Sequence, residues 1–223
     1  MIVVIGSPVG WLRDEEVVPY GMAARAALAA AAAGSQVQLV GRTGGDAAAD
    51  ALLLSLARGG VGHVAVLRDP SRSTTLVPEP VGDDGPAAPP DDPPGDAPVP
   101  VPVPATPSLP PLDPADVDLG LRYLTNYAVV VMAEPAEPEV IRVVTAAAQW
   151  TAARLVAVVA AGAEPSDQLP SDAIVFEAPV DDPDGDFAGL VGRFAAALDD
   201  GADAADAFRS TVAAEGWTES RPD

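Results

Sequence analysis

Residues 19–61 read PYGMAARAALAAAAAGSQVQLVGRTGGDAAADALLLSLARGGV, and this stretch decides the class of fold. Its first part, from Pro19 to Ala33, is rich in alanine and predicts a helix that Gly34 ends. The apolar residues at 37–40 then predict a strand. Asp46 can cap a second helix, whose leucines recur at helical spacing along one face. A helix, a strand and another helix in this order are typical of an α/β fold.

The same alternation continues on both sides of this stretch. Further strands are predicted at 2–5, 63–67, 128–132, 155–160 and 174–176, and further helices at 137–151, 187–198 and 202–214. Strands that alternate with helices at this spacing form a parallel sheet with helices on both faces. We therefore expect residues 1–223 to form one α/β domain.

One segment, residues 78–114, interrupts the alternation. It holds 15 of the 25 prolines and 7 acidic residues but no basic residue, and it contains the run PVPVPVP at 98–104. Such a sequence favours extended polyproline II backbone and has too little apolar bulk to fold alone. We interpret it as a flexible or semi-rigid linker. A proline-rich recognition motif is the alternative, although no basic residue flanks the run.

The composition excludes several classes of protein. The formal net charge of −21 opposes binding to a phosphate backbone, so no nucleic-acid partner is expected. The chain has no Cys and no Lys, which excludes disulfides, thiolate catalysis, Schiff bases and a P-loop lysine. The first residues lack the pattern of a signal peptide and the alanine run at 26–33 is far too short for a membrane span, so a cytoplasmic protein without membrane contact is expected.

Three parts of the sequence together resemble the ribokinase-like (PfkB) carbohydrate kinase family. They are IVVIGSPVGWL at 2–12 with residues 19–61, YAVVVMAEPAEPEVIRVVTAAAQWTAARLVAV at 127–158, and VDDPDGDFAGLVGRFAAALDDGADAADAF at 180–208. The resemblance implies a three-layer α/β fold with a mostly parallel sheet and helices on both faces. It also implies, for an active member, phosphoryl transfer from ATP and Mg²⁺ to a sugar or similar hydroxyl.

The catalytic end of this resemblance is altered. Asp186 matches the Asp that deprotonates the hydroxyl in the family. The small residues that should form an anion site before it are replaced, which leaves Asp184 and Gly185 as its remnant. Carboxylates at a helix start cap the helix and repel a phosphoryl group. Asp182, Asp184 and Asp186 also alternate as in a calcium loop, but Phe187 stands where that loop needs Gly, so a capping cluster without a metal is expected.

The substrate end departs at several matching positions. Four of them carry residues that differ from the family's sugar contacts, and together they indicate that the sugar site is lost. The residues of this former substrate pocket are Trp11, Tyr20, Gly21, Arg25, Gly44 and Asp46, with Gly45 in place of a family Asp. An alternative is that Tyr20 and Arg25 form a new site for an anionic or aromatic ligand.

The nucleotide half is shortened as well. The short sequence between Ala160 and Asp181 contains no Asn-x-x-Glu metal motif, and the chain has no sequence for the family's small β-lid. We therefore expect a ribokinase-like fold without a lid and with a reduced nucleotide-binding half. Elsewhere, His63 is interpreted as a surface or satisfied histidine, and Trp150 and Trp217 as packing residues.

These observations leave three functional hypotheses. The first is a degenerate carbohydrate kinase homologue that has lost phosphotransfer and acts as a binding or regulatory module, with itself or a full-length kinase relative as partner. In this reading no cofactor and no metal are assigned. The second is an active ATP-dependent sugar or nucleoside kinase with Asp186 as general base. The third is a structural partner that binds no small ligand.

Overall fold

The computed structural model describes residues 1–14, 16–77 and 112–214. Its centre is a sheet of six strands that all run parallel, in the spatial order β5-β4-β1-β7-β8-β9. The strands are β1 (Ile2–Ile5), β4 (Val37–Gly44), β5 (Val61–Asp69), β7 (Val129–Met132), β8 (Arg154–Val159) and β9 (Ile174–Glu177). Strands β1 and β7 are buried along their whole length, as expected in a parallel sheet covered on both faces.

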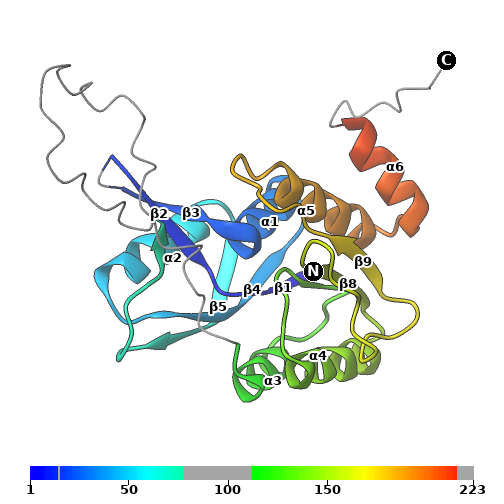
Figure 1. Ribbon diagram of the computed structural model, residues 1–223, viewed down its shortest axis with the longest axis horizontal. Coiled ribbons are helices and arrows are strands. Elements are labelled where there is room, and N and C mark those ends of the chain that lie inside the picture. Colours follow the sequence, from blue (N-terminus) through cyan, green and yellow to red (C-terminus); the bar gives the residue numbers. More distant parts are fainter. Residues whose placement is uncertain (15, 78–111, 215–223) are drawn as a thin grey trace, which may run out of the picture.

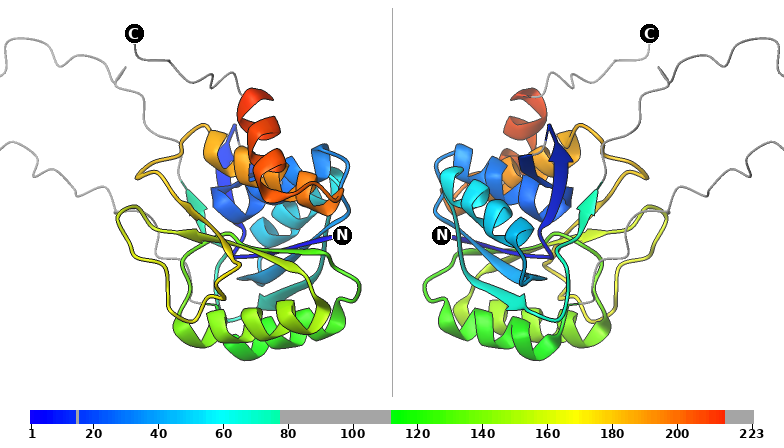
Figure 2. Two further views of the ribbon diagram at one scale, coloured as in Figure 1. Left: turned by 90° about the vertical axis from the view of Figure 1, so that its right-hand side faces the viewer. Right: turned by 90° about the vertical axis from the view of Figure 1, so that its left-hand side faces the viewer.

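Helices cover both faces of this sheet and make three layers (Figures 1 and 2). One face carries α3 and α4, and the other carries α1, α2, α5 and α6. The helices are α1 (Gly21–Ala32), α2 (Ala47–Arg58), α3 (Pro114–Tyr123), α4 (Pro138–Thr151), α5 (Asp186–Asp199) and α6 (Ala204–Ala214). The predicted fold class, a three-layer α/β structure around a parallel sheet, is confirmed.

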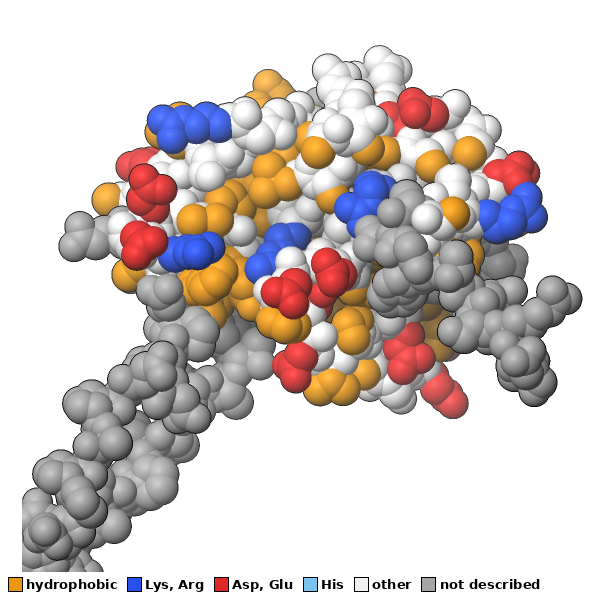
Figure 3. Space-filling model, turned by 90° about the horizontal axis from the view of Figure 1, so that it is seen from above, with side chains coloured by type: hydrophobic (Ala, Val, Ile, Leu, Met, Phe, Trp, Pro, Cys, Tyr) orange, Lys and Arg blue, Asp and Glu red, His pale blue; other side chains and the backbone are white. Residues whose placement is uncertain are grey.

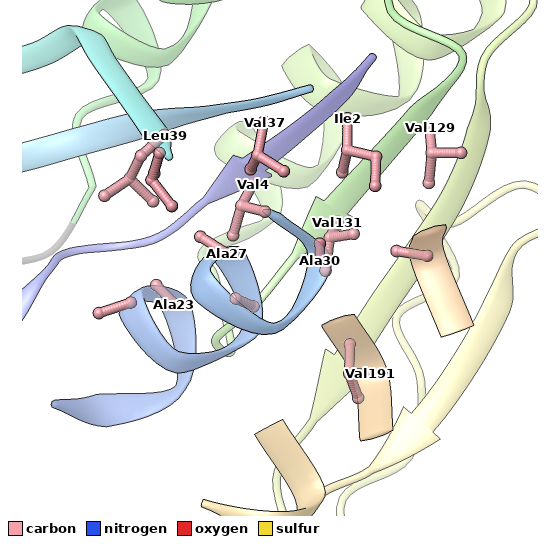
Figure 4. Close-up of a cluster of buried hydrophobic side chains, with 14 of the residues drawn as sticks. Ile2, Val4, Ala23, Ala27, Ala30, Val37, Leu39, Val129, Val131 and Val191 are labelled. Carbon is pink, nitrogen blue, oxygen red and sulfur yellow. The ribbon is translucent and has the colours of Figure 1, made fainter. Parts of the chain in front are cut away.

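Small residues bring α1 close to the sheet and to α5. The alanines at 23, 27 and 30 point toward the valines of the central strands (Figure 4). Helix α5 then packs on α1 at Gly192, where an added Cβ would lie 2.3 Å from the carbonyl oxygen of Ala26. A larger side chain cannot fit there without separating the two helices.

The order of the strands creates a switch point at the centre of the sheet. After β1, the chain forms β4 and β5 on one side and then returns to form β7, β8 and β9 on the other. In open α/β sheets, ligands bind outside the carboxyl ends of the strands at this point. The residues that follow β1 and β7 therefore occupy the position from which a site is expected.

A second, three-stranded sheet corrects the sequence analysis. Strands β2 (Val9–Arg13) and β3 (Glu16–Tyr20) form an antiparallel pair, and β6 (Leu76–Val77) lies parallel to β2. Pro19, predicted in the first turn of a helix, lies instead in β3, and α1 begins two residues later. An edge strand tolerates Pro because its outer amides need no partner. The predicted absence of a substrate lid stays a prediction.

Helix α3 is also absent from the sequence analysis, which extended the proline-rich segment to residue 114. The side chain of Asp113 accepts a hydrogen bond from the amide of Ala115 at 2.8 Å, and Pro114 takes the first helical position. Both features start helices. The rest of the predicted linker, residues 78–111, and Trp217 lie outside the described residues.

The remaining predicted elements agree with the structure apart from their ends. Asp46 caps α2, whose buried residues are Ala49, Leu52, Leu53 and Leu56, as predicted. The prediction that Trp150 packs in the interior is wrong, because 92% of its surface is exposed. The buried stripe of α4 runs through Val140, Val144 and Ala148 and leaves position 150 on the outer face. Over the described part of the chain, no helix is long and apolar enough to cross a membrane.

Candidate functional site

A hydrogen bond joins the two loops at the switch point. Ser7 follows β1, and its amide donates to Oε1 of Glu134, which follows β7, at 2.9 Å. Both residues lie at the carboxyl ends of their strands, next to each other at the centre of the sheet. The structure therefore places a carboxyl group where ligands of open α/β sheets bind.

The carboxyl group of Glu134 has an unusual pKa. Burial raises the pKa of Glu134 to about 7, and the hydrogen bond from Ser7 opposes this rise only in part. At neutral pH, the group is therefore present in both its protonated and its ionised form. Such a group can donate or accept a hydrogen bond or take up a proton from a ligand.

Sequence reasoning did not select Glu134 as a site residue. A signal was present, because Glu134 is the first charged residue after the buried apolar run of β7. A charged side chain directly after a buried parallel strand lies at the edge of the sheet that binds ligands. Its hydrogen bond, however, comes from Ser7, which is 127 positions away along the chain, so no local pattern shows it.

The start of α1 carries no side-chain cap within the described residues. Its N-cap residue, Tyr20, makes no capping hydrogen bond, and the first turn contains no acidic residue. Gly21 begins the helix with φ +76°, a conformation that favours glycine. The first amides of α1 and the positive end of its dipole are therefore not neutralised by a carboxylate of the helix itself.

The start of α5 is closed by a carboxylate. Both oxygens of Asp182 accept hydrogen bonds there, from the amides of Phe187 at 3.1 Å and Ala188 at 3.0 Å. Gly185, with φ +80°, forms the turn that brings Asp182 back onto the helix. Asp184 and Asp186 are exposed, so the member of the predicted cluster that caps the helix is Asp182. The position for an external anion at this helix start is filled by the chain itself.

A chain of stacked side chains leads from the small sheet to the start of α5. The guanidinium of Arg25 lies 4.2 Å from the centre of the Tyr20 ring and donates to the carbonyl oxygen of Asp182 at 3.0 Å. The rings of Tyr20 and Trp11 meet edge to face, with 5.6 Å between their centres. The guanidinium of Arg13 lies over the Trp11 ring. These contacts hold Arg25 across the turn that contains Asp182.

Asp46, another predicted pocket residue, is used for local structure. Its carboxylate accepts from the amide of Ala49 at 3.0 Å and from the amide and hydroxyl of Thr74 at 2.9 and 2.5 Å. The hydrogen bonds from Thr74 are the main reason that the pKa of Asp46 lies below its ordinary value. Both oxygens therefore already have partners, and none is directed to a ligand.

The hollow next to the turn at Gly44 is small. It lies at the carboxyl ends of β1 and β4 and has a volume of about 20 Å³. A cavity of this size holds about one water molecule and no sugar. Its lining includes Ser7, Arg42, Thr43, Gly44, Arg72 and Ser73.

The predicted site residues thus fall into separate groups. The structure brings Trp11, Tyr20 and Arg25 together with Gly185, and it places Gly21 at the start of α1. Gly44 and Asp46 belong to the turn that Thr74 holds. In the described ranges, no three His, Asp or Glu side chains are grouped so that they could hold a metal ion. Seen from above, arginines and acids lie beside one another rather than in separate fields (Figure 3).

Comparison with known proteins adds a fold but no family assignment. No family model and no curated protein matches the sequence. Among solved structures, the ribokinase of Arabidopsis thaliana complexed with ribose and ATP has a TM-score of 0.62 at 14% identity, over 96% of this chain and 90% of that one. The aminoimidazole riboside kinase of Salmonella enterica has a TM-score of 0.57 at 15% identity, over 99% and 94%. The chain therefore has a ribokinase-like fold.

Proposed function

We propose that this ribokinase-like chain does not transfer phosphoryl groups and acts as a binding or regulatory module. The observation that carries the proposal is the position of Asp182, whose carboxylate takes the first free amides of α5. A phosphoryl group needs such amides to stabilise its charge during transfer. In this chain, the amides already have a negatively charged partner.

The electrostatics at α5 support this reading. A phosphate that approached the helix start would meet the carboxylate of Asp182 and the exposed Asp184 and Asp186. Two like charges about 4 Å apart repel by about 4 kcal/mol near a protein surface. Displacement of Asp182 would in addition remove two hydrogen bonds. The residues present do not fit the phosphates of ATP, and we derive no transfer step through them.

The start of α1 and the neighbouring Glu134 support a binding function. The helix start has no carboxylate cap within the described residues, and Glu134 can donate or accept a proton near pH 7. A small polar ligand with hydroxyl or acidic groups would find complementary partners there. This reading places ligand binding at the switch point of the sheet and leaves α5 with a structural role.

An activity assay separates this proposal from an active kinase. Wild-type protein is incubated with ATP, Mg²⁺ and a panel of sugars and nucleosides, and the release of ADP is measured. We expect no release that depends on the sugar or nucleoside. Turnover that depends on a substrate and disappears in Asp186→Asn would overturn the proposal and support Asp186 as a general base.

A binding assay tests the role of Glu134. A thermal-shift screen of polar small molecules is run on the wild type and on Glu134→Gln, which keeps the size of the side chain. A ligand present at 100 times its Kd adds about 2.7 kcal/mol of stability. We expect stabilisation of the wild type that is reduced in the variant. Equal stabilisation of both proteins would contradict binding at the switch point.

A further inference from the structure

A groove on the face of the molecule opposite to α1 and α5 has no role in the proposed function. It lies between α3 and α4, which run along one face of the sheet (Figure 2), and its volume is about 750 Å³. This volume is in the range of ligand and peptide sites, unlike the small hollow at β4. Its lining includes Leu121, Arg122, Tyr127, Arg142, Ala147 and Trp150.

The groove has an exposed aromatic wall and a buried aromatic floor. Trp150 of α4 lines the groove and is 92% exposed. Tyr127 also lines it, is 4% exposed and donates to the carbonyl oxygen of Ala147. The whole chain contains only 3 Trp and 3 Tyr, so an aromatic side chain left almost fully in water is an unusual use of a scarce residue type. An exposed aromatic side chain at the edge of a groove of this size is typical of binding sites.

The charges at the groove favour an acidic occupant. Arg142 of α4 lines the groove, is exposed, and makes no ion pair with any other described residue. Arg122 of α3 lines it too, although it is paired with Asp118. Asp118 lines the groove as well and neutralises Arg122, so Arg142 supplies the positive charge that attracts a segment with acids and no bases.

We propose that this groove binds residues 98–104 of the same chain, the run PVPVPVP. Proline-rich segments in the polyproline II conformation bind grooves lined by aromatic side chains, because their shape is preformed and little entropy is lost. The chain also provides the complementary charge, since residues 78–111 contain six acids and no base. The groove and the proline run thus match in shape, and the complementary charge comes from the acids that precede the run, of which Asp96 is the nearest.

The connection between the two is long enough. Seven residues lie between Pro104 and Leu112, the first described residue before α3, and the eight steps from Pro104 to Leu112 span about 25 Å in polyproline II. Helix α3 has 10 residues and is about 15 Å long. A chain that turns back before α3 can therefore pass along the whole groove. Because the segment is joined to α3, which forms one side of the groove, binding is intramolecular and needs little intrinsic affinity.

The test uses Trp150 as its own reporter in the full chain. The protein is labelled with 5-fluorotryptophan, the resonance of Trp150 is assigned with Trp150→Phe, and its solvent exposure is measured by the fluorine isotope shift between H₂O and D₂O. In one variant, residues 98–104 are replaced by a Gly-Ser sequence of equal length. In the matched control, residues 84–90 are replaced in the same way, so the tether length is kept in both.

We expect Trp150 to be protected in the wild type and in the control and to become exposed in the 98–104 variant. A synthetic peptide of residues 96–106, added to that variant, should shift the resonance back saturably. Arg142→Gln should weaken this peptide binding about fivefold at low salt. Binding of the peptide that is lost with Trp150→Ala, in a protein that keeps its circular dichroism, would place the contact at the groove.

Two results would overturn the proposal. Equal exposure of Trp150 in the wild type and the 98–104 variant means that the run does not cover the groove. Protection that rises with protein concentration, together with a dimer mass in light scattering, means that a second copy covers it instead.

Discussion

Helices α1 and α5 pack on each other and begin in contrasting ways. Each begins beside a glycine with positive φ, Gly21 in one and Gly185 in the other. At α5, the carboxylate of Asp182 accepts from two amides, whereas at α1 the N-cap residue makes no side-chain cap. One positive helix start is therefore neutralised by a carboxylate, and the other has no side-chain cap from its N-cap residue and no acid in its first turn.

The two helix starts differ in whether a carboxylate of the chain accepts from their free amides. At α5, Asp182 does so and also stabilises the helix, so one contact both fills the helix start and supports the fold. At α1, the group closest to a functional role is Glu134, which the fold holds with a raised pKa. Variants that alter either region test this comparison directly.

The largest effect is expected from separation of the two helices. Gly192→Leu would place a side chain against the carbonyl oxygen of Ala26, and we expect a loss of about 3 kcal/mol in the free energy of unfolding, measured by urea denaturation. The control is Ala205→Leu on the exposed surface of α6, which should change stability little. An equal loss of stability in both variants would mean that close packing of α1 and α5 at Gly192 is not the cause.

The next effect is a pH dependence that comes from Glu134. Its pKa rises from 4.5 to about 7 on folding, so the folded state binds the proton more tightly. The free energy of unfolding then falls as pH rises from about 4.5 to about 7, by an amount on the order of 3 kcal/mol. Glu134→Gln should remove this fall when stability is measured by urea denaturation between pH 5 and 8.

The titration of Asp46 does not contribute to the fall in stability between pH 5 and 8. The pKa of Asp46 is lowered below its ordinary value of 3.8, so its contribution is present above that pH and is lost only as pH falls further. That window does not overlap with the range from 5 to 8. If the fall in stability between pH 5 and 8 persisted unchanged in Glu134→Gln, the raised pKa would have to belong to another group.

A smaller effect is expected at the start of α5. Asp182→Ala removes the acceptor for two amides and should lower stability by about 1–2 kcal/mol in thermal or urea unfolding. Asp184→Ala, at an exposed position two residues away, is the matched control and should have almost no effect. Inorganic phosphate should then stabilise Asp182→Ala more than the wild type. A phosphate effect of equal size in both would show that Asp182 does not occupy an anion position.

The smallest effect concerns the stacked chain. Arg25→Met keeps most of the apolar stem but removes the cation over Tyr20 and the hydrogen bond to the carbonyl oxygen of Asp182, so a loss of about 1 kcal/mol is expected in urea unfolding. Arg13→Met is the control, because Arg13 is exposed and lies farther from its ring, at 5.6 Å. A larger loss for Arg13→Met would contradict the bridging role of Arg25.

Much of the fold could be predicted because its elements have local signals. The apolar strands, the alanine-rich helix and the cap at Asp46 are visible within windows of a few residues. Strands β2 and β3 were not predicted, because the residues around Trp11 and Pro19 give no clear alternation of apolar and polar side chains. The position of Trp150 was wrong because an aromatic residue was taken to be buried, whereas the buried stripe of α4 does not include it.

The site was less predictable than the fold. The sequence indicated that acids surround the start of α5, but it did not show which one turns back onto the helix. That choice depends on the turn at Gly185, which directs Asp182 to the amides and leaves Asp186 exposed. The raised pKa of Glu134 depends in the same way on burial by distant parts of the chain.

By itself, the sequence determined an acidic, lysine-free α/β chain with parallel strands, because composition needs no structure and hydrophobic periodicity is visible in short windows. Only the tertiary structure decided that Asp182 closes α5, that Arg25 crosses to it from α1, and that Glu134 is held by Ser7. The reason is physical: these contacts join residues more than 100 positions apart, except for the cap, and even the cap needs a loop geometry that no spacing prescribes.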